Sequence, residues 1–267
     1  MTIIDAHCHV YPEKIALKAV EAIGSFYGIP VRCPGTPGGL AEEHGKAGIS
    51  HAVIHSVATA PQQVRSINRF IAAAMKENPD RFTGLGTLHP RAEDVRADIE
   101  DLIALGLHGV KLHPDFQRFR LDDPVCETMF SICQEMDLPV LIHTGDPRYD
   151  FSNPDRLVPV LKRFSRLRVI GAHFGGWSLW EEAAEKLSGF AQMCVDTSSS
   201  LYAMTPEAGA RLVRIWGAER CIFGTDYPMW DTAEELKRFH EMKLTAAEEE
   251  QILWKTAARV YGITVPE

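Results

Sequence analysis

Two histidines near the start of the chain have the spacing of metal ligands. His7 and His9 lie in the segment DAHCHV, directly after a short apolar run. Side chains two residues apart on a strand point to the same face, so both imidazoles can reach one ion while Cys8 points away from it. The pair therefore predicts a divalent cation at the end of a first strand.

Other apolar segments also end in a residue that could bind a metal. His143 closes LPVLIH, His173 closes RVIGAH, and Asp226 follows IFGT. One such histidine alone is commonly a satisfied core residue, but several at the ends of separate strands favour a shared site. Three neutral imidazoles with one carboxylate suit Zn²⁺, and Mn²⁺ or Fe²⁺ could substitute. Other predicted strands end in or near His55, His89, His113 and Asp196.

Two glycines lie two residues before candidate site residues. Gly171 precedes His173 and Gly224 precedes Asp226 at this spacing. Alternation along a strand predicts that each glycine shares the inward face of the residue it precedes. The missing side chains would leave room for an ion and a substrate atom.

Two basic residues allow more than one interpretation. Lys111, in GVKLHP, could be an electrostatic group, a carboxylated metal bridge or a solvated side chain. Arg148, in GDPRYD, could bind a substrate carboxylate through its planar fork, or could pair with Asp146 or Asp150. We expect both Lys111 and Arg148 to contact substrate.

The elements that must position these residues alternate along the chain. Short apolar segments predict strands at 3–9, 51–57, 82–88, 107–112, 138–143, 167–173, 191–196 and 220–225. Amphipathic segments predict helices at 61–77, 91–105, 123–136, 154–164, 178–188, 205–216, 231–241 and 245–261. Eight such units predict a single α/β domain over residues 1–267, a (β/α)8 TIM barrel, whose strands all end at one mouth. A doubly wound open sheet is the alternative, and the absence of GxGxxG after any strand weakens it.

The connection after the first strand, residues 10–50, is longer than any other and rich in glycine and proline over 32–40. At the mouth of a barrel it would be either a lid or substrate wall, or a surface excursion. Trp177 and Trp230 follow strands six and eight. They would line an aromatic pocket or pack beneath this loop.

Composition excludes several other classes of protein. The formal net charge of −8 argues against a nucleic-acid surface, and no segment reaches the ~18 apolar residues of a membrane helix. The six cysteines form no CxxC pair and the N-terminus resembles no signal peptide, which predicts a cytoplasmic location. We expect a small-molecule substrate, and the outer helices could form a homodimer.

Several motifs along the whole chain resemble the amidohydrolase superfamily. They are DAHCHV, NPDRFTGLGTLHP, GVKLHP, LIHTG, GAHFGG, VDTSS, FGTDYP and KTAARVYGI, the last with Thr256 where an asparagine is common. Order and spacing are most similar to the branch that includes aminocarboxymuconate-semialdehyde decarboxylase and γ-resorcylate decarboxylase. The resemblance implies one divalent ion held by His7, His9, His143 and Asp226, with His173 hydrogen-bonded near a solvent or substrate oxygen. It also implies that Lys111 is unmodified.

Three functions are compatible with such a site. In the first, metal-activated water hydrolyses an ester, amide or lactone, with Asp226 moving the proton and His173 orienting water or stabilising the oxyanion. In the second, the same site removes CO₂ from an aromatic or muconate-type acid without an oxidant. In the third, the barrel binds metal without catalysis. We expect hydrolysis, because related decarboxylases have longer insertions than this chain.

Overall fold

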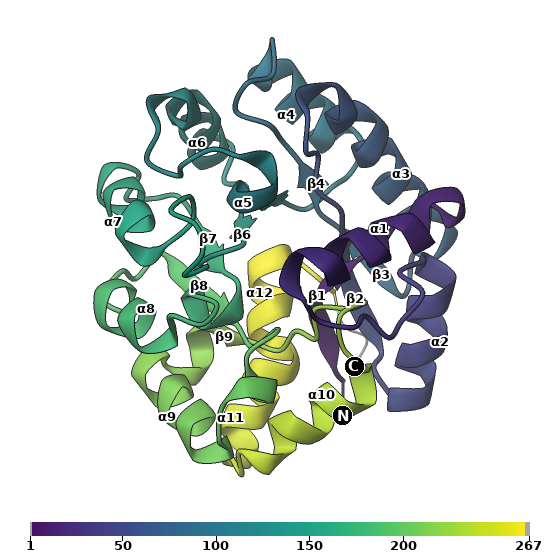
Figure 1. Ribbon diagram of the computed structural model, residues 1–267, viewed down its shortest axis with the longest axis vertical. Helices are drawn as coiled ribbons and strands as arrows, with labels where there is room; N and C mark the ends of the chain where they lie inside the picture. The colour runs from purple at the N-terminus through teal and green to yellow at the C-terminus, as the bar shows by residue number, and fades with distance from the viewer. Residues whose placement is uncertain (1, 265–267) are drawn as a thin grey trace.

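The computed structural model describes residues 2–264 and contains two groups of parallel strands (Figure 1). The first group has the order β1 (Ile4–His9), β2 (His51–His55), β3 (Phe82–Gly84). The second group continues in chain order as β4 (Gly86–Thr87), β5 (Val110–Leu112), β6 (Val140–Ile142), β7 (Val169–Gly171), β8 (Met193–Asp196) and β9 (Cys221–Ile222).

Backbone hydrogen bonds join these two groups into one closed barrel. At the first seam, β3 and β4 are one strand interrupted at Leu85. The N–H of Leu85 donates to the carbonyl of Ile54 on the β2 side, and the N–H of Gly86 donates to the carbonyl of Gly109 on the β5 side. At the second seam, the N–H groups of Ala6 and His9 donate to the carbonyls that follow β9, at 2.9 and 2.7 Å. The predicted eight-stranded (β/α)8 fold is confirmed.

Helices surround the barrel, as Figure 1 shows. Several begin at predictable caps: Thr205 accepts from the N–H of Ala208 ahead of Pro206, and Asp231 accepts from the N–H of Glu234. The helices are α1 (Glu13–Tyr27), α2 (Pro37–Ala47), α3 (Val64–Glu77), α4 (Val95–Ala104), α5 (Pro114–Gln117), α6 (Glu127–Glu135), α7 (Pro154–Arg163), α8 (Trp180–Leu187), α9 (Pro206–Trp216), α10 (Thr232–Glu241), α11 (Ala246–Glu250) and α12 (Thr256–Tyr261). A π-helical turn over Gln251–Lys255 joins α11 to α12.

Alternating residues of the strands fill two separate layers of core. The layer inside the barrel includes Ile4, Val53, Leu141, Ile170 and Ile222, and it is covered by Ala257, Val260 and Tyr261 of α12. The layer between strands and outer helices contains their neighbours, such as Ile54, Val169 and Val195. Side chains at the strand starts thus plug the barrel, and only the other end is left for a site.

Strand β1 contains one extra residue relative to β2. Asp5 pairs with Ala52, but Cys8 pairs with Ile54, so three steps along β1 match two along β2. This bulge switches the alternation, because Ala6 belongs to the inner core while His7 and His9 point into the barrel mouth. One short strand can therefore supply both the apolar plug and two candidate ligands.

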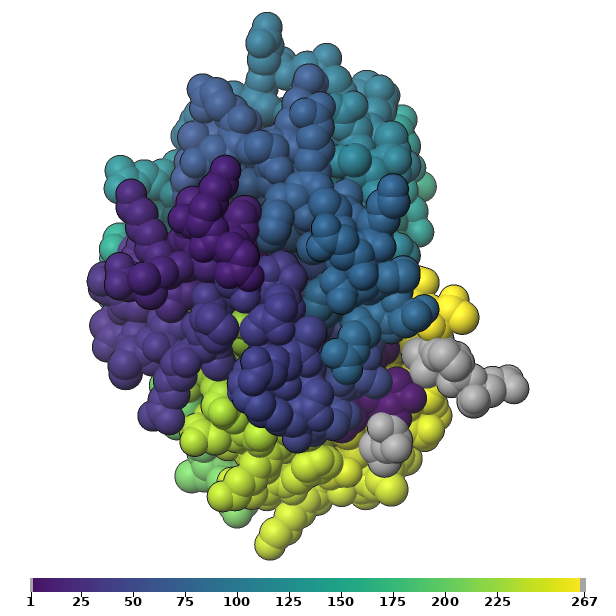
Figure 2. All heavy atoms as spheres, turned by 90° about the vertical axis from the view of Figure 1, so that its right-hand side faces the viewer, coloured from purple at the N-terminus to yellow at the C-terminus, as the bar shows by residue number. Residues whose placement is uncertain are grey.

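The first connection is more regular than the sequence indicated. It contains α1 and α2, and α2 begins at Thr36, which accepts from the N–H of Gly39, and ends at left-handed Gly48. Figure 2 shows this segment covering the side of the molecule between α3 and α10. Within residues 2–264, no helix is long and apolar enough to cross a bilayer.

The predicted orientation of Gly171 is wrong. A Cβ at this position would collide with the Cε of Met193, which belongs to the outer core. The strand ends at Gly171 and His173 has a φ of 60°, so alternation no longer relates the two residues. Gly224 does face inward, where a Cβ would meet the Cβ of His7 at 2.9 Å. The space it leaves admits the His7 side chain.

Candidate metal centre

Three atoms converge where β1 meets the end of β9. The Nε2 atoms of His7 and His9 lie 3.3 Å apart, and Asp226 Oδ1 lies 3.3 Å from His7 and 3.5 Å from His9. Ligands held ~2.1 Å from an ion in tetrahedral geometry stand about 3.4 Å from one another. The three side chains therefore already have the mutual spacing of first-row metal ligands.

Asp196 determines which nitrogen of His7 faces this point. Its Oδ2 lies 2.8 Å from His7 Nδ1, so the Nδ1–H donates to the carboxylate and Nε2 keeps its lone pair. Oδ1 accepts from the N–H groups of His173 and Ser198, both at 3.0 Å, and from the Ser198 hydroxyl. The sequence placed Asp196 at a strand end without giving it this orienting role.

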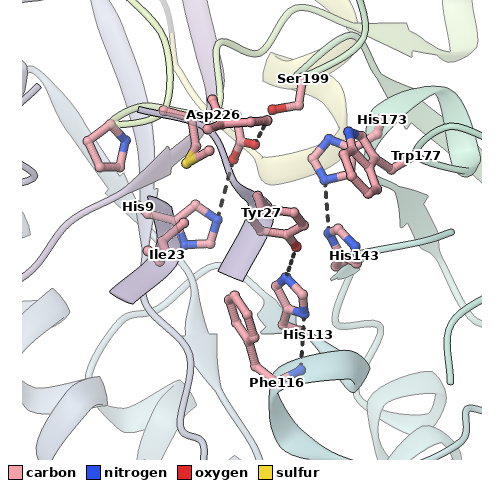
Figure 3. Close-up of a pocket in the computed structure, with 13 residues that line it drawn as sticks. His9, Ile23, Tyr27, His113, Phe116, His143, His173, Trp177, Ser199 and Asp226 are labelled. Carbon is pink, nitrogen blue, oxygen red and sulfur yellow. Dashed lines mark hydrogen bonds and ion pairs between the residues drawn. The ribbon is translucent and has the colours of Figure 1, made fainter. Parts of the chain in front are cut away.

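His143 and His173 form a second pair of facing nitrogens. His173 Nδ1 lies 2.9 Å from the carbonyl of Ser198 and His143 Nε2 lies 3.1 Å from that of Gly145, so each of these nitrogens carries the donated proton. The remaining two, His143 Nδ1 and His173 Nε2, are 3.0 Å apart (Figure 3). Two neutral imidazoles then direct lone pairs at each other, an arrangement that a shared proton or a cation satisfies.

Burial keeps these imidazoles neutral, as metal ligands must be. It lowers the pKa of His7, His9 and His143 well below the usual value, helped by Lys111 and neighbouring histidines, and that of His173 to about 4. Burial raises the pKa of Asp226 to about 6, while the Ser199 hydroxyl and Lys111 act in the opposite direction. These residues fit a divalent cation.

The structure brings the predicted ligands together unevenly. His7, His9 and Asp226 share one point, whereas the nitrogens of His143 contact His173 and the Gly145 carbonyl. His143 also stacks on His113 and lies 3.7 Å from Asp115. The role of His143 as a ligand thus stays a prediction.

Lys111 lies behind the cluster. Its Nζ is fully buried and lies 3.0 Å from His7 Nε2, so the interpretation as a solvated side chain is wrong. Burial lowers the pKa of Lys111 to about 8, although Asp226 and Asp196 favour its charged form. It is not among the residues that line the pocket, so direct substrate contact stays a prediction.

Ser199 and Trp230 hold the outer oxygen of Asp226. Trp230 Nε1–H donates to Ser199 Oγ at 2.8 Å, which leaves the hydroxyl proton of Ser199 to donate to Asp226 Oδ2 at 2.5 Å. The Trp230 ring stacks on Tyr202 with centroids 4.3 Å apart. The sequence shows serines at 198–200 but does not predict this chain of hydrogen bonds, because the chain depends on the conformation of the loop.

A narrow pocket opens in front of His9 and Asp226 (Figure 3). Ile23 and Tyr27 of α1 line one side, so the first connection forms a wall of this pocket, and contact of that wall with substrate stays a prediction. The other lining residues are Ile29, His113, Phe116, His143, His173, Trp177, Ser199, Pro228 and Met229. A pocket of this kind suits a flat, mostly apolar molecule.

Tyr27 extends from α1 toward the centre of the pocket. Its hydroxyl lies 2.9 Å from His113 Nε2, and its ring meets Trp177 edge-on at a centroid distance of 5.2 Å. Trp177 therefore lines the pocket, whereas Trp230 packs outside it. Tyr27 was not a candidate in the sequence, and His113 was noted there only as a histidine near a strand end, without a role.

Arg148 is bonded within the protein. Its Nε and Nη2 donate to the two oxygens of Asp146 at 2.9 and 2.7 Å, and Nη1 donates to the Phe26 carbonyl at 2.7 Å. The guanidinium also lies 4.8 Å from the ring centre of Phe26 and 5.2 Å from that of Tyr27. The pairing with Asp146 is the one observed, and Arg148 does not line the pocket. Its role in substrate binding stays a prediction.

Three of the site residues have a left-handed backbone. The φ angles are 60° at His173, 43° at Ser199 and 62° at Asp226. Residues other than glycine seldom adopt such angles, and each costs on the order of 1 kcal/mol or more. The hydrogen bonds around Asp196 and Asp226 hold these residues in place.

The chain is similar to a known protein family and to a decarboxylase from another organism. The pattern of the family described as Amidohydrolase matches residues 4–263. A 2-amino-3-carboxymuconate-6-semialdehyde decarboxylase from Dictyostelium discoideum is 33% identical over 134 residues, which cover 41% of this chain and only 37% of that protein.

Two solved structures share the fold at low sequence identity. An uncharacterised TIM-barrel protein from Bordetella bronchiseptica is 22% identical, with a TM-score of 0.82 over 98% of this chain and 99% of that one. A 5-carboxyvanillate decarboxylase from Novosphingobium aromaticivorans, complexed with manganese and a nitrobenzoic acid, is 16% identical, with a TM-score of 0.76 over 98% and 96%.

Proposed function

The chain belongs to the amidohydrolase family, and on that premise we propose that it is a metal-dependent, nonoxidative decarboxylase of an aromatic acid with one carboxylate. The observation that carries the proposal is the pocket, in which aromatic walls face His9 and Asp226 directly. The similarity to proteins named as decarboxylases supports it further, and supports decarboxylation over the hydrolysis expected from the sequence.

The lining of the pocket favours a substrate with a single carboxylate. Of the described residues that line it, none is arginine or lysine. A second carboxylate buried there would lack a cationic partner, which costs several kcal/mol in a dry site. Tyr27 and His113 instead offer neutral hydrogen-bonding groups, which suit a phenolic hydroxyl.

The residues divide the reaction between them. A divalent cation, held by His7, His9 and Asp226 and also by the predicted ligand His143, would supply a positive charge that binds the substrate carboxylate or an adjacent oxygen. Asp226 gives a proton to the ring carbon that bears the carboxylate. The bond from that carbon to the carboxylate then breaks, its electron pair restores the ring, and CO₂ leaves. His173, whose Nδ1–H donates to the Ser198 carbonyl, would accept a hydrogen bond at Nε2 from a hydroxyl of the substrate.

The walls serve the same step by excluding water. Tyr27, Phe116 and Trp177 line the pocket and would cover the faces of a bound ring, which limits the access of water to Asp226. The proton that Asp226 gives up returns from solvent after the product leaves.

The test is a substrate panel for the enzyme loaded with Mn²⁺ or Zn²⁺. We expect release of ¹³CO₂ from carboxyl-labelled hydroxybenzoic acids with one carboxylate, and slower release from the dicarboxylates. Lactones and esters in H₂¹⁸O form the second half of the panel. Incorporation of ¹⁸O without CO₂ release would replace the proposal with hydrolysis.

A further inference from the structure

His55 lies at the end of β2, directly opposite His9 in the strand register. Val53 belongs to the inner core and Ile54 to the outer core, so His55 has the inward position of its strand. The imidazole is fully buried and does not line the substrate pocket. It therefore lies behind His9, on the inner side of the candidate metal centre.

Neither ring nitrogen of His55 has a hydrogen-bond partner among the described residues. A buried polar group left unpaired costs ~1–3 kcal/mol, and this imidazole has two such atoms. An apolar residue at the end of β2 would avoid that cost. A divalent cation is one group that would give an imidazole in this place a partner.

The neighbours of His55 are the two histidines of β1. Its ring centre lies 4.4 Å from that of His9 and 4.9 Å from that of His7, with interplanar angles of 89° and 76°. One nitrogen from each of the three rings lies within 4.8 Å of the other two. Rings at such angles can direct in-plane lone pairs toward one point.

A second buried group shows what an unsuitable arrangement looks like. His113, Asp115 and His143 also lie within 4.8 Å of one another, but the two imidazoles are stacked at 3.9 Å with an interplanar angle of 7°. Their in-plane lone pairs run parallel and do not converge. Its nitrogens also have partners, such as Tyr27 for His113 and Gly145 for His143.

We propose that His55 is a further ligand of the divalent cation that His7 and His9 bind. The inference rests on the cation centre of the proposed function, but not on the reaction. Direct ligation at ~2.1 Å needs neighbouring ligand atoms about 3.4 Å apart. The nitrogen of His55 lies within 4.8 Å of those of His7 and His9, and rotation about the Cβ–Cγ bond, which has a broad energy well, is the movement available to close the remaining distance.

The experiment compares cation binding in wild type, His55→Gln and His55→Leu. The readouts are the Kd for Zn²⁺ from chelator competition and the visible absorption of the Co²⁺-loaded protein, whose bands report coordination number. His51→Gln is the matched control, because His51 starts the same strand at the opposite end of the barrel and bonds to Thr83.

We expect both His55 variants to bind Zn²⁺ at least tenfold more weakly and to change the Co²⁺ bands, with His51→Gln like wild type. Without metal, His55→Leu should melt no lower than wild type, since it removes an unpaired polar group. Unchanged Kd and Co²⁺ bands in a folded His55→Leu or His55→Gln protein would overturn the role of His55 alone. Failure of wild type to bind any divalent cation would overturn the metal centre as well.

Discussion

The two sides of the barrel mouth hold their polar groups in opposite ways. At β8 and β9, Asp196 accepts four hydrogen bonds and Asp226 is held by Ser199, so the positions of both carboxylates are fixed by the protein. At β2, the buried His55 has no hydrogen-bond partner among the described residues. The difference indicates that the first side is preorganised, whereas the second depends on what is bound there.

Replacing Asp226 tests the preorganised side most severely. Asp226→Asn removes one ligand charge and the proposed proton donor, so we expect kcat to fall by about 10³ or more and metal content to fall with it. Turnover and elemental analysis of the purified variant provide the two measurements. Unchanged turnover would mean that the proton comes from elsewhere in the pocket.

Removal of the Ser199 hydroxyl should have a smaller effect. Ser199→Ala takes away the donor to Asp226 Oδ2, a bond to a charged group, and we expect cation affinity to fall about tenfold. Trp230→Phe keeps the stacking on Tyr202 but frees the hydroxyl to rotate, so its effect should be weaker still. Equal effects of the two variants on Kd would contradict a role through the hydroxyl.

Loosening α1, which lines one side of the pocket, should weaken the binding of substrate and leave cation binding unchanged. Arg148→Ala removes the bonds to Asp146 and Phe26 that anchor the end of α1. We expect KM to rise about fivefold with an unchanged cation Kd, and Arg148→Lys not to restore KM, since lysine lacks the planar fork. A change in cation Kd would show that the wall and the metal centre are coupled.

Replacement of Glu235 in α10 should have the smallest effect, a change in stability that depends on pH. It is buried, one of its oxygens has no partner among the described residues, and burial raises its pKa to about 7 despite Arg238. Between the unfolded pKa of ~4.3 and the folded value, the unfolded chain loses its proton first, so the free energy of unfolding falls as pH rises. Glu235→Gln has no carboxyl group to titrate, so its stability should not fall in this way. The Tm of the variant minus the Tm of wild type should therefore be larger at pH 8 than at pH 5. An equal difference in Tm between variant and wild type at the two pH values would contradict the raised pKa of Glu235.

Much of the fold followed from local pattern, and the errors have local causes. The eight strands were found because each is apolar and short. Three of them end where predicted, but those predicted at 51–57, 82–88, 138–143, 167–173 and 220–225 end earlier, and rim residues such as His173 and Asp226 have left the extended conformation. The helix α2 was missed although Thr36, Pro37 and Gly48 mark its ends. Gly38 and Gly39 in its first turn hid the helical pattern.

The site was predictable where the barrel alone determines it. His7, His9 and Asp226 meet because the ends of all parallel strands meet at one mouth. Tyr27 depends on how α1 packs against the pocket, and Ser199 depends on a left-handed loop residue. Neither can be obtained from spacing along the chain, because both arise from contacts between distant segments.

The left-handed backbone at His173, Ser199 and Asp226 has a consequence for laboratory evolution. Glycine at any of these positions would relax the main chain, so a screen that scores only folded protein should enrich changes that destroy the enzyme. Variants of this barrel with higher thermal stability therefore have to be selected for turnover as well, or the substitutions have to be confined to residues away from the barrel mouth.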